Sequence, residues 1–239
     1  ALITSPSETV KGLVGAAWRG NGLPDVRVIP NGFPAERFAC SRRDRKILLV
    51  TRMLPRKGVQ YFLQAIEGLK LDYEVHIVGE GPMRAELEEL AKRTPTPVKF
   101  WGWLDNASDE LRELYETSAI FVFPSLSENF PVVLLEAMTA GLAIITSDIR
   151  GCPEVVGDTA LLVPPESPGA IREQLLRLIE SAELVGQLGD AARDRVRTLF
   201  DWPLVVEGYT EAFGHAVVPD LERAHIRTMA PEVNDDGRG

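Results

Sequence analysis

Two glutamates, Glu128 and Glu136, stand eight residues apart across a predicted strand–loop–helix junction. The strand ends at Phe123, the loop contains Glu128, and a helix predicted over Pro131–Ala140 contains Glu136. Glu136 is flanked by apolar residues and borders a buried face, where an ionised carboxylate is costly unless donors satisfy it. Hydroxyl groups of a ligand would supply such donors. The pair therefore indicates either a polyhydroxylated ligand or acid–base chemistry.

Cations follow the first strand of the predicted sheet. Arg52, Arg56 and Lys57 lie between this strand and a helix that is expected to begin after Gly58. A helix N-terminus carries roughly half a positive charge, and arginine can bind phosphate through two hydrogen bonds. The segment predicts an anion site suited to a diphosphate. The same residues also fit a solvated loop with surface cations.

The two carboxylates have alternative interpretations. They fit a glycoside hydrolase, in which one carboxyl is the general acid and the other is the nucleophile or base. They also fit one solvated loop residue and one helix residue paired with a cation. A hydrolase does not need a diphosphate site, whereas here cations and carboxylates are predicted to share one crevice. We therefore favour a ligand with phosphates at one end and hydroxyls at both sides.

The loop Gly79–Pro82 joins a strand to a helix, and Gly79 and Gly81 would let the backbone approach a ligand. Tight strand-to-helix turns also use glycine without binding anything. His76 lies within a strand pattern, which is typical of a core histidine. The sequence has no His, Cys and Asp cluster with metal-ligand spacing and no Asp-X-Asp after a strand. We therefore expect Arg, Lys and backbone groups to meet phosphate charge, with no metal and no cofactor.

Composition limits the class of protein. With 239 residues and 45% apolar content, the chain can bury one full domain and part of a second. A formal net charge of −9 argues against a general nucleic-acid or anionic-membrane surface, so a phosphate site must be local. Cys40 and Cys152 are too few for a disulfide framework. With no apolar run long enough to cross a bilayer, we expect cytoplasmic residence, and peripheral attachment at the inner membrane face is left open.

The chemistry-bearing residues must be positioned by a parallel sheet, because short apolar runs alternate with helical patterns. The predicted strands are Lys46–Thr51, Glu74–Val78, Val98–Trp101, Ile120–Phe123, Ala143–Thr146 and Ala160–Val163. The predicted helices between them are Val59–Leu69, Pro82–Arg93, Asp109–Thr117 and Pro131–Ala140. This pattern predicts a doubly wound α/β fold, in which ligands bind outside the carboxyl ends of the strands, where strand order reverses. We therefore expect one rim to gather the loops that begin at Arg52, Gly79, Gly102 and Pro124.

The ends of the chain differ from its middle. The N-terminal part predicts one βαβ unit, with elements at Leu2–Thr4, Glu8–Trp18 and Val26–Ile29. Such a unit cannot cover its own sheet faces, so we interpret residues 1–35 as the last unit of another domain. Residues 36–216 would then form the main domain, with C-terminal helices predicted at Ile171–Leu188, Ala191–Leu199 and Leu204–Ala216. Residues 217–239 are expected to be a flexible tail.

Taken together, these segments resemble the retaining glycosyltransferases of the GT-B fold, specifically family four. The resemblance runs from about Thr4 to Phe213, and the Glu pair with seven intervening residues is the family's signature. Its other carriers are Val28–Gly32 with Phe38, Thr51–Gly58, Ile77–Pro82, Phe100–Trp103, Phe121–Ser125, Gly151–Val156 and Phe200–Trp202.

The resemblance implies roles for the site residues. Arg52 and Lys57 would hold the diphosphate of the donor and stabilise the departing nucleotide. Glu128 would contact hydroxyls of the donor sugar, and Glu136 the ribose hydroxyls. Donor contacts are also implied for Gly79, Gly81, Gly102, Trp103, Leu104, Asn129, Phe130, Pro131 and Val132, of which Gly102–Leu104 would lie near the base.

The implied reaction is transfer of a sugar from a UDP-, GDP- or ADP-sugar to an acceptor hydroxyl, without metal and with retention of anomeric configuration. Many family members have glycine where this chain has Asn129 and Pro131, and proline removes one backbone donor. In the family, an N-terminal Rossmann-like domain binds the acceptor, which is a sugar, a lipid or a small molecule. We therefore expect the isolated chain to lack part of the machinery for turnover.

Two other functions stay open on the sequence. A non-catalytic nucleotide-sugar-binding or regulatory subunit would keep the pocket without the transfer reaction. A two-domain GT-B epimerase or hydrolase is disfavoured, because the Glu spacing and the Phe200–Trp202 segment resemble those of the transferases.

Overall fold

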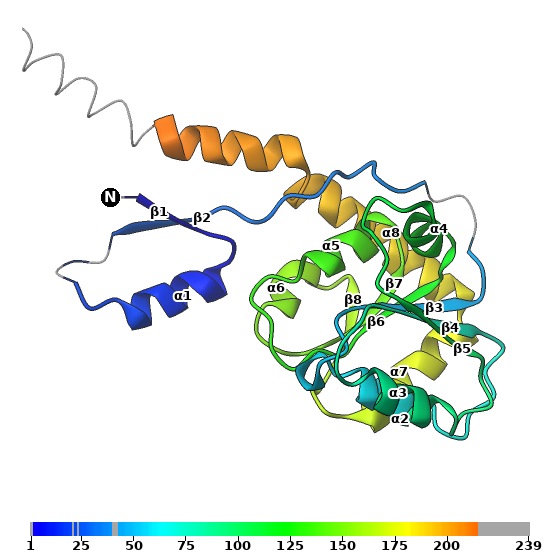
Figure 1. The fold of residues 1–239 in the computed structure, drawn as a ribbon. Coiled ribbons are helices and arrows are strands. Elements are labelled where there is room, and N and C mark those ends of the chain that lie inside the picture. Colours follow the sequence, from blue (N-terminus) through cyan, green and yellow to red (C-terminus); the bar gives the residue numbers. More distant parts are fainter. Residues whose placement is uncertain (1, 21, 23, 40–42, 215–239) are drawn as a thin grey trace, which may run out of the picture.

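The computed structural model of the chain describes residues 2–20, 22, 24–39 and 43–214. Its larger sheet is parallel, with the strand order β5-β4-β3-β6-β7-β8 (Figure 1). These strands are β3 (Lys46–Val50), β4 (Glu74–Val78), β5 (Val98–Gly102), β6 (Ile120–Phe123), β7 (Ala143–Ser147) and β8 (Ala160–Val163). The chain builds outward from β3 to β5, returns to β6 beside β3, and then builds outward in the other direction. The doubly wound sheet predicted from the sequence is confirmed.

Helices cover both faces of this sheet (Figure 1). One face packs against α2 (Val59–Ala65), α3 (Arg84–Ala91) and α7 (Pro168–Glu180). The other packs against α4 (Asp109–Thr117), α5 (Val132–Thr139), α6 (Cys152–Val156) and α8 (Ala182–Leu199). Ile47 and Leu49 of β3 belong to the first core and Leu48 to the second, because successive strand side chains point to opposite faces. Burial on both faces explains why the strands are continuous apolar runs.

The C-terminal helices divide at a different residue from the one predicted. The chain breaks at Ser181, and α8 runs without interruption to Leu199, so the predicted division after Leu188 is wrong. The hydroxyl of Ser181 accepts a hydrogen bond from the Leu184 backbone N–H at 3.1 Å and thereby caps α8. Gly189 stays helical and lies against the Gly141 carbonyl, which would be 2.2 Å from an added Cβ. This glycine allows close packing of a helix and does not end one.

Other boundaries differ less. Helix α2 ends at Ala65 and α3 covers Arg84–Ala91, so both are shorter than predicted. Helix α6 and the 3-10 helix η1 (Pro55–Lys57) were not predicted, because elements of five and three residues are too short to show a period. The 3-10 helix carries Lys57, one of the residues predicted to bind a diphosphate.

The N-terminal unit consists of β1 (Leu2–Ser5), α1 (Glu8–Ala17) and β2 (Asp25–Val28), as predicted. Its strands pair in parallel, and no residue of α1 is buried. Residues 202–214 form a helix that returns to this unit, where Val205 and Ala212 pack with Ile29 (Figure 1). The division at residues 35 and 36 stays a prediction. The predicted tail and the last residues of the helix predicted at Leu204–Ala216 lie outside the described residues.

Several contacts join the N-terminal unit to the larger domain. The Phe33 N–H donates to the Phe200 carbonyl at 2.8 Å, and the Ala35 N–H donates to the Asp201 side chain at 3.0 Å. The Glu154 carboxylate accepts from the Glu8 N–H at 2.5 Å, at the start of α1. The segment Phe200–Trp202 therefore serves as a joint between the end of α8 and the N-terminal unit.

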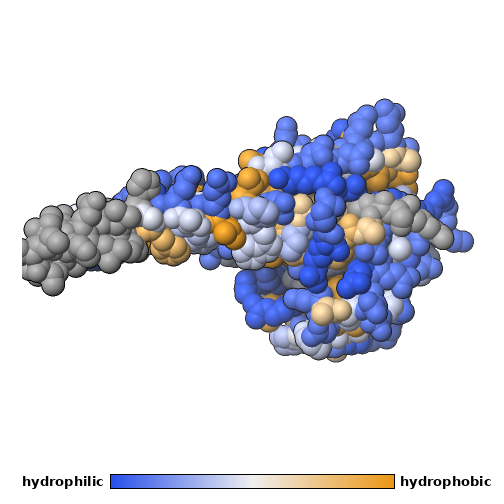
Figure 2. All heavy atoms as spheres, turned by 90° about the horizontal axis from the view of Figure 1, so that it is seen from above, coloured by the Kyte–Doolittle hydropathy of each residue, from blue (hydrophilic) through white to orange (hydrophobic). Residues whose placement is uncertain are grey.

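The surface does not show one broad apolar region on the face in Figure 2, where apolar residues form separate patches among hydrophilic ones. Trp202, Val206 and Phe213 of the last described helix are each about half exposed. Among the described residues, no helix is long and apolar enough to span a bilayer.

Candidate functional site

A cavity of about 300 Å³ lies at the carboxyl ends of β3 and β6, the strands between which the order of the sheet reverses. Doubly wound sheets bind ligands at this position. Three segments line it: the end of β3 with its loop, the loop after β6, and the start of α5. The lining residues are Val50, Thr51, Arg52, Lys57, Phe123, Glu128, Phe130, Pro131, Val132 and Val133.

Two of the lining residues, Lys57 and Glu128, form an ion pair. Lys57 Nζ donates to Glu128 Oε1 at 2.5 Å, and each side chain is only 12% exposed. The Ser125 hydroxyl donates to the same oxygen at 2.6 Å, and Ser125 is fully buried. Lys57 Nζ also lies 5.5 Å from the centre of the Phe123 ring, within the range of a cation–π interaction. The Ser125 hydroxyl and the Phe123 ring therefore contact an ion pair that consists of one carboxylate oxygen and one ammonium group.

Backbone contacts hold the two loops of the cavity together. The Leu126 N–H donates to the Arg56 carbonyl at 2.8 Å, so Arg56 contributes its backbone here while its side chain is exposed. Gly58 has a φ of 73°, and a Cβ at this position would lie 1.8 Å from the Pro124 carbonyl oxygen. The Lys57–Glu128 distance therefore depends on a backbone approach that only glycine permits.

Arg52 also lines the cavity, but it is held differently from Lys57. Its side chain is exposed, and it makes no ion pair with any residue that the structure describes. The structure brings the predicted residues Arg52, Lys57 and Glu128 to one cavity. Two cations and one carboxylate give its lining a net positive charge, which suits an anionic ligand group.

Glu136 lies outside the lining of this cavity and has a separate partner. The Tyr115 hydroxyl donates to Glu136 Oε2 at 2.6 Å. Burial raises the pKa of the Glu136 carboxyl, and this effect outweighs the hydrogen bond from Tyr115 and the charge of Arg37, which act in the opposite direction. Burial, together with the adjacent Glu136 charge, raises the pKa of Tyr115 well above its ordinary value. The sequence predicted that the Glu136 carboxylate needs hydrogen-bond donors at a buried face. In the structure Tyr115, a residue of the same chain, supplies one such donor.

Gly79 and Gly81 approach backbone of this chain. A Cβ on Gly79 would lie 2.0 Å from the Thr51 carbonyl oxygen, and one on Gly81 would lie 2.4 Å from that of Met53. The Met53 N–H donates to the Glu80 carbonyl at 2.8 Å. These glycines therefore join the loops after β3 and β4, which is the structural alternative that the sequence left open. Neither glycine lines the cavity.

The segment Gly102–Leu104, which begins at the last residue of β5, is not among the residues that line the cavity. The Gly102 carbonyl accepts from the Gly79 N–H at 2.7 Å, so this loop also lies on the carboxyl rim. Trp103 is 70% exposed, and Leu104 packs against the core that contains α4 and α5. Neither of them lines the cavity with Lys57.

The start of α5 is part of the cavity wall. Phe130, Pro131 and Val132 line the cavity, whereas Asn129 is exposed and its carbonyl lies against Gly151. The Phe130 ring packs edge-on against Phe200, with 5.9 Å between ring centres. The first N–H groups of a helix lack partners within the helix, so α5 presents backbone donors at this wall. Pro131 itself has no N–H to donate.

Sequence reasoning missed Ser125, Tyr115 and Phe123, which hold the predicted residues in place. The position of Ser125 could have indicated its role, because it is a small polar residue that follows a buried strand and precedes Glu128 by three residues. Phe123 could not be distinguished from other core residues of its strand. Tyr115 stands 21 residues before Glu136 on another helix, so no local pattern connects them.

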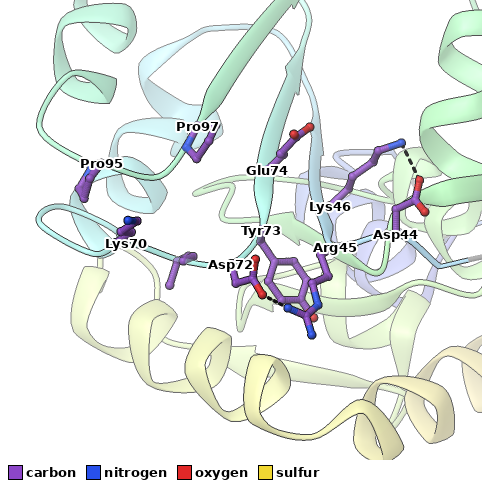
Figure 3. Close-up of a pocket in the computed structure, with 10 residues that line it drawn as sticks. Asp44, Arg45, Lys46, Lys70, Asp72, Tyr73, Glu74, Pro95 and Pro97 are labelled. Atoms are coloured by element: carbon purple, nitrogen blue, oxygen red, sulfur yellow. Dashed lines mark ion pairs between the residues drawn. The ribbon is translucent and has the colours of Figure 1, made fainter.

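A larger cavity, of about 510 Å³, lies at the opposite end of the sheet (Figure 3). Four of its charged residues form two ion pairs: Lys46 Nζ lies 3.0 Å from an Asp44 carboxylate oxygen, and Arg45 pairs with Asp72. The second pair is more than two-thirds exposed at both partners. None of the residues predicted to act on a ligand lies in this cavity.

Comparison with known proteins identifies the family. Residues 44–181, more than half of the chain, match the family described as "Glycosyl transferases group 1". The chain therefore belongs to the group 1 glycosyltransferases, and its six-stranded domain has the Rossmann-like fold of GT-B glycosyltransferases. Among the described residues, no group of three or more His, Cys, Asp or Glu side chains could hold a metal ion.

Similar proteins include a glycogen synthase of Mycobacterium tuberculosis, 30% identical over 206 residues. That match covers 81% of this chain and 49% of the relative. A phosphatidyl-myo-inositol mannosyltransferase of Mycolicibacterium smegmatis is 31% identical, over 79% of this chain and 52% of the relative. The chain thus spans about half the length of these curated relatives.

Solved structures share the fold. Anabaena HepE in complex with UDP-glucose superposes with a TM-score of 0.76 at 18% identity, covering 90% of this chain and 64% of that one. The C-terminal domain of LpcC, a group 1 glycosyltransferase from Francisella tularensis, has a TM-score of 0.63 at 24% identity. That match covers 72% of this chain and the whole of that domain.

Proposed function

We propose that this chain is the nucleotide-sugar-binding half of a retaining, metal-independent glycosyltransferase. In this reaction a hexose passes from a UDP-, GDP- or ADP-sugar to an acceptor hydroxyl. The acceptor is a sugar, a lipid or a small molecule, and a further N-terminal domain would bind it. The proposed place of action is the cytoplasm, with the inner membrane face as the place where a lipid acceptor would be met.

One observation carries the proposal: Arg52, Lys57 and Glu128 line the same cavity at the reversal point of the sheet. Cations of this kind bind phosphate, and a carboxylate accepts hydrogen bonds from sugar hydroxyls. A glycoside hydrolase would need the carboxylate without the cations. The combination favours a ligand that joins a diphosphate to a sugar.

The proposed roles follow from the charges that develop during transfer. As the glycosidic bond breaks, negative charge accumulates on the leaving diphosphate. Preorganised positive groups at that position stabilise the transition state more than the ground state. Arg52, Lys57 and the start of α5 supply such groups, so metal would not be needed to offset this charge. Glu128 would bind the donor sugar.

The nucleoside would extend from the cavity toward the loop after β5. Glu136, with one oxygen held by Tyr115, would accept hydrogen bonds from the ribose through the other oxygen. The Gly102–Leu104 segment would contact the base, where the exposed ring of Trp103 offers a flat apolar surface. Exposed aromatic rings tolerate any base, so the geometry leaves UDP, GDP and ADP as candidates.

Isothermal titration calorimetry with UDP, GDP and ADP tests the proposal. At least one nucleotide should bind the folded chain, and Lys57→Ala should weaken nucleotide binding far more than binding of the corresponding nucleoside. Circular dichroism and a thermal melt establish that each protein is folded. Failure of all three nucleotides to bind a folded chain contradicts the proposal, and an equal loss of nucleotide and nucleoside contradicts the role of Lys57.

A further inference from the structure

We infer that the Lys57–Glu128 ion pair is exchanged when an intact donor binds, so that the site distinguishes a nucleotide sugar from the nucleoside diphosphate left after transfer. This inference rests on the proposed function, and it adds a coupling between binding of the diphosphate and binding of the sugar. In that function the cation belongs to the diphosphate and the carboxylate belongs to the sugar. In the structure the two groups bind one another.

The geometry makes the pair a competitor of the ligand. Lys57 Nζ lies 2.5 Å from Glu128 Oε1, and both side chains are 12% exposed. Both line the cavity, so a ligand there meets a cation whose charge is already offset. Arg52 lines the same cavity without an ion pair to any described residue. A diphosphate therefore finds one available cation and one that Glu128 holds.

Drawing Lys57 toward a phosphate has a cost that depends on the sugar. Glu128 would then remain largely buried with only the Ser125 hydroxyl on its paired oxygen. A largely buried carboxylate that loses its cation is unfavourable, and it repels the nearby diphosphate as well. Sugar hydroxyls donate hydrogen bonds to the carboxylate and compensate for the departure of Lys57. A nucleoside diphosphate has no such group at this position.

Glu136 provides the contrast within the same helix–loop segment. Its oxygen is held by the neutral Tyr115 hydroxyl, and it forms no ion pair with any described residue. The ribose that it is proposed to bind is present in both ligands. Removing the charge of Glu136 should therefore affect both ligands alike, whereas removing that of Glu128 should affect them in opposite directions.

The experiment measures the affinity of the 239-residue chain for three ligand pairs by calorimetry: UDP and UDP-glucose, GDP and GDP-mannose, ADP and ADP-glucose. The pair that the wild type binds is then titrated into Glu128→Gln and Glu136→Gln. In Glu128→Gln the diphosphate should bind about tenfold more tightly and the nucleotide sugar about tenfold more weakly, the scale of one charge-assisted hydrogen bond. In the matched control Glu136→Gln both ligands should lose affinity by a similar factor.

Ser125→Ala supplies a second, independent variant. It leaves the charges in place but removes the hydroxyl that supports Glu128 when Lys57 departs. Binding of the diphosphate should weaken several-fold, while the nucleotide sugar, whose hydroxyls satisfy Glu128, should change less. The preference for the sugar ligand thus rises in this variant and falls in Glu128→Gln.

The outcomes distinguish failure of the ion-pair exchange from failure of the proposed function on which it rests. A wild-type chain that is folded and binds none of the six ligands overturns the proposed function and the exchange together. A wild type that binds a pair, with Glu128→Gln shifting both ligands in the same direction, overturns the exchange alone. Equal losses for both ligands in Ser125→Ala do the same, and they decide the question if Glu128→Gln does not fold.

Discussion

The carboxyl and amino ends of the same sheet each border a charged cavity, of about 300 Å³ and about 510 Å³ respectively. The amino-end cavity is larger, and one of its two ion pairs, Arg45–Asp72, is exposed to solvent, whereas Lys46–Asp44 is less exposed. The carboxyl-end cavity is smaller, and its Lys57–Glu128 pair is largely buried beside Arg52. The cavity that we propose to bind the donor is therefore the smaller of the two.

The difference between the two ends is one of charge and burial. Exposed pairs such as Arg45–Asp72 are screened by water, and they contribute little to stability or to recognition. A largely buried pair such as Lys57–Glu128 is also contacted by Ser125 and Phe123, and water cannot readily replace either partner. Changes at the carboxyl end should therefore have large effects, and matched changes at the amino end should have small ones.

Substitution of Gly58 and of Gly68 by alanine compares the backbone at the two ends of the sheet. Of all the pairs of variants, these two should differ most in the free energy of unfolding. Both have left-handed φ values, 73° and 72°. An added Cβ at Gly58 would clash with Pro124 O, whereas one at Gly68 would meet nothing within 4 Å. Gly58→Ala should lower the free energy of unfolding by about 2 to 5 kcal/mol, the left-handed cost together with overpacking. Gly68→Ala should cost about 1 to 2 kcal/mol.

Urea denaturation of both variants measures these values. Equal destabilisation would mean that the approach of the β3 and β6 loops contributes nothing beyond the φ angle. In that case the Lys57–Glu128 distance does not depend on the close approach of Gly58 to the Pro124 carbonyl.

Lys57 and Lys70 test the cations of the two cavities. Lys57→Ala should weaken nucleoside diphosphate binding by about 2 kcal/mol, or roughly thirtyfold, because it removes a cation and leaves Glu128 without its partner. Lys70→Ala removes a cation from the amino-end cavity and should leave that affinity unchanged within error. Calorimetry on the two variants makes the comparison. A similar loss in both would show that general positive charge, and not the carboxyl-end site, governs binding.

Glu136 and Glu74 compare a buried carboxylate with an exposed one. Because burial raises the pKa of folded Glu136, this group favours the folded state at low pH, and that contribution is lost as pH rises from about 4.5 through the raised pKa. Glu136→Gln removes this loss, so the stability of the variant relative to the wild type should be higher at pH 7 than below pH 4.5. Glu74→Gln, at the exposed amino end, should stay within about 0.5 kcal/mol at both pH values.

Thermal melts of the three proteins at pH 4 and pH 7 check this prediction. If the stability of Glu136→Gln relative to the wild type does not rise between pH 4 and pH 7, the prediction is contradicted. The same variant is expected to bind nucleotide more weakly, so a more stable protein with poorer binding is the signature of a functional carboxylate.

Arg45→Ala should have the smallest effect. The Arg45–Asp72 pair is exposed, and exposed pairs contribute at most about 1 kcal/mol. Neither the midpoint of thermal unfolding nor nucleotide affinity should change appreciably. A loss of nucleotide affinity in this variant would break the contrast between the two ends.

Much of the fold followed from local pattern. The strand Ile120–Phe123 was predicted with the bounds it has, because a fully buried parallel strand is a continuous apolar run. The helix break at Ser181 was missed, and the predicted break between Leu188 and Ala191 falls at Gly189, which stays helical and packs against the Gly141 carbonyl. A pattern along the chain does not record which backbone will lie against a glycine.

The candidate site was predictable where topology alone determines it. Arg52 and Lys57 follow β3, and Glu128 follows β6. These two parallel strands are neighbours, and the sheet is built outward from them in opposite directions, so the loops that follow them lie together. The sequence could not connect Tyr115 with Glu136, nor show that Gly79 and Gly81 approach Thr51 and Met53. Those contacts join segments whose distance depends on packing.

The sequence by itself determined the class of fold, the order of its strands along the chain and the residues that can carry charge on one rim. Periodicity and residue chemistry are local properties, so they can be read without coordinates. Only the tertiary structure decided that Lys57 and Glu128 pair, that Ser125 supports them, and that Glu136 lies apart with Tyr115. These are contacts between distant segments, and their distances result from how helices and loops pack on the finished sheet.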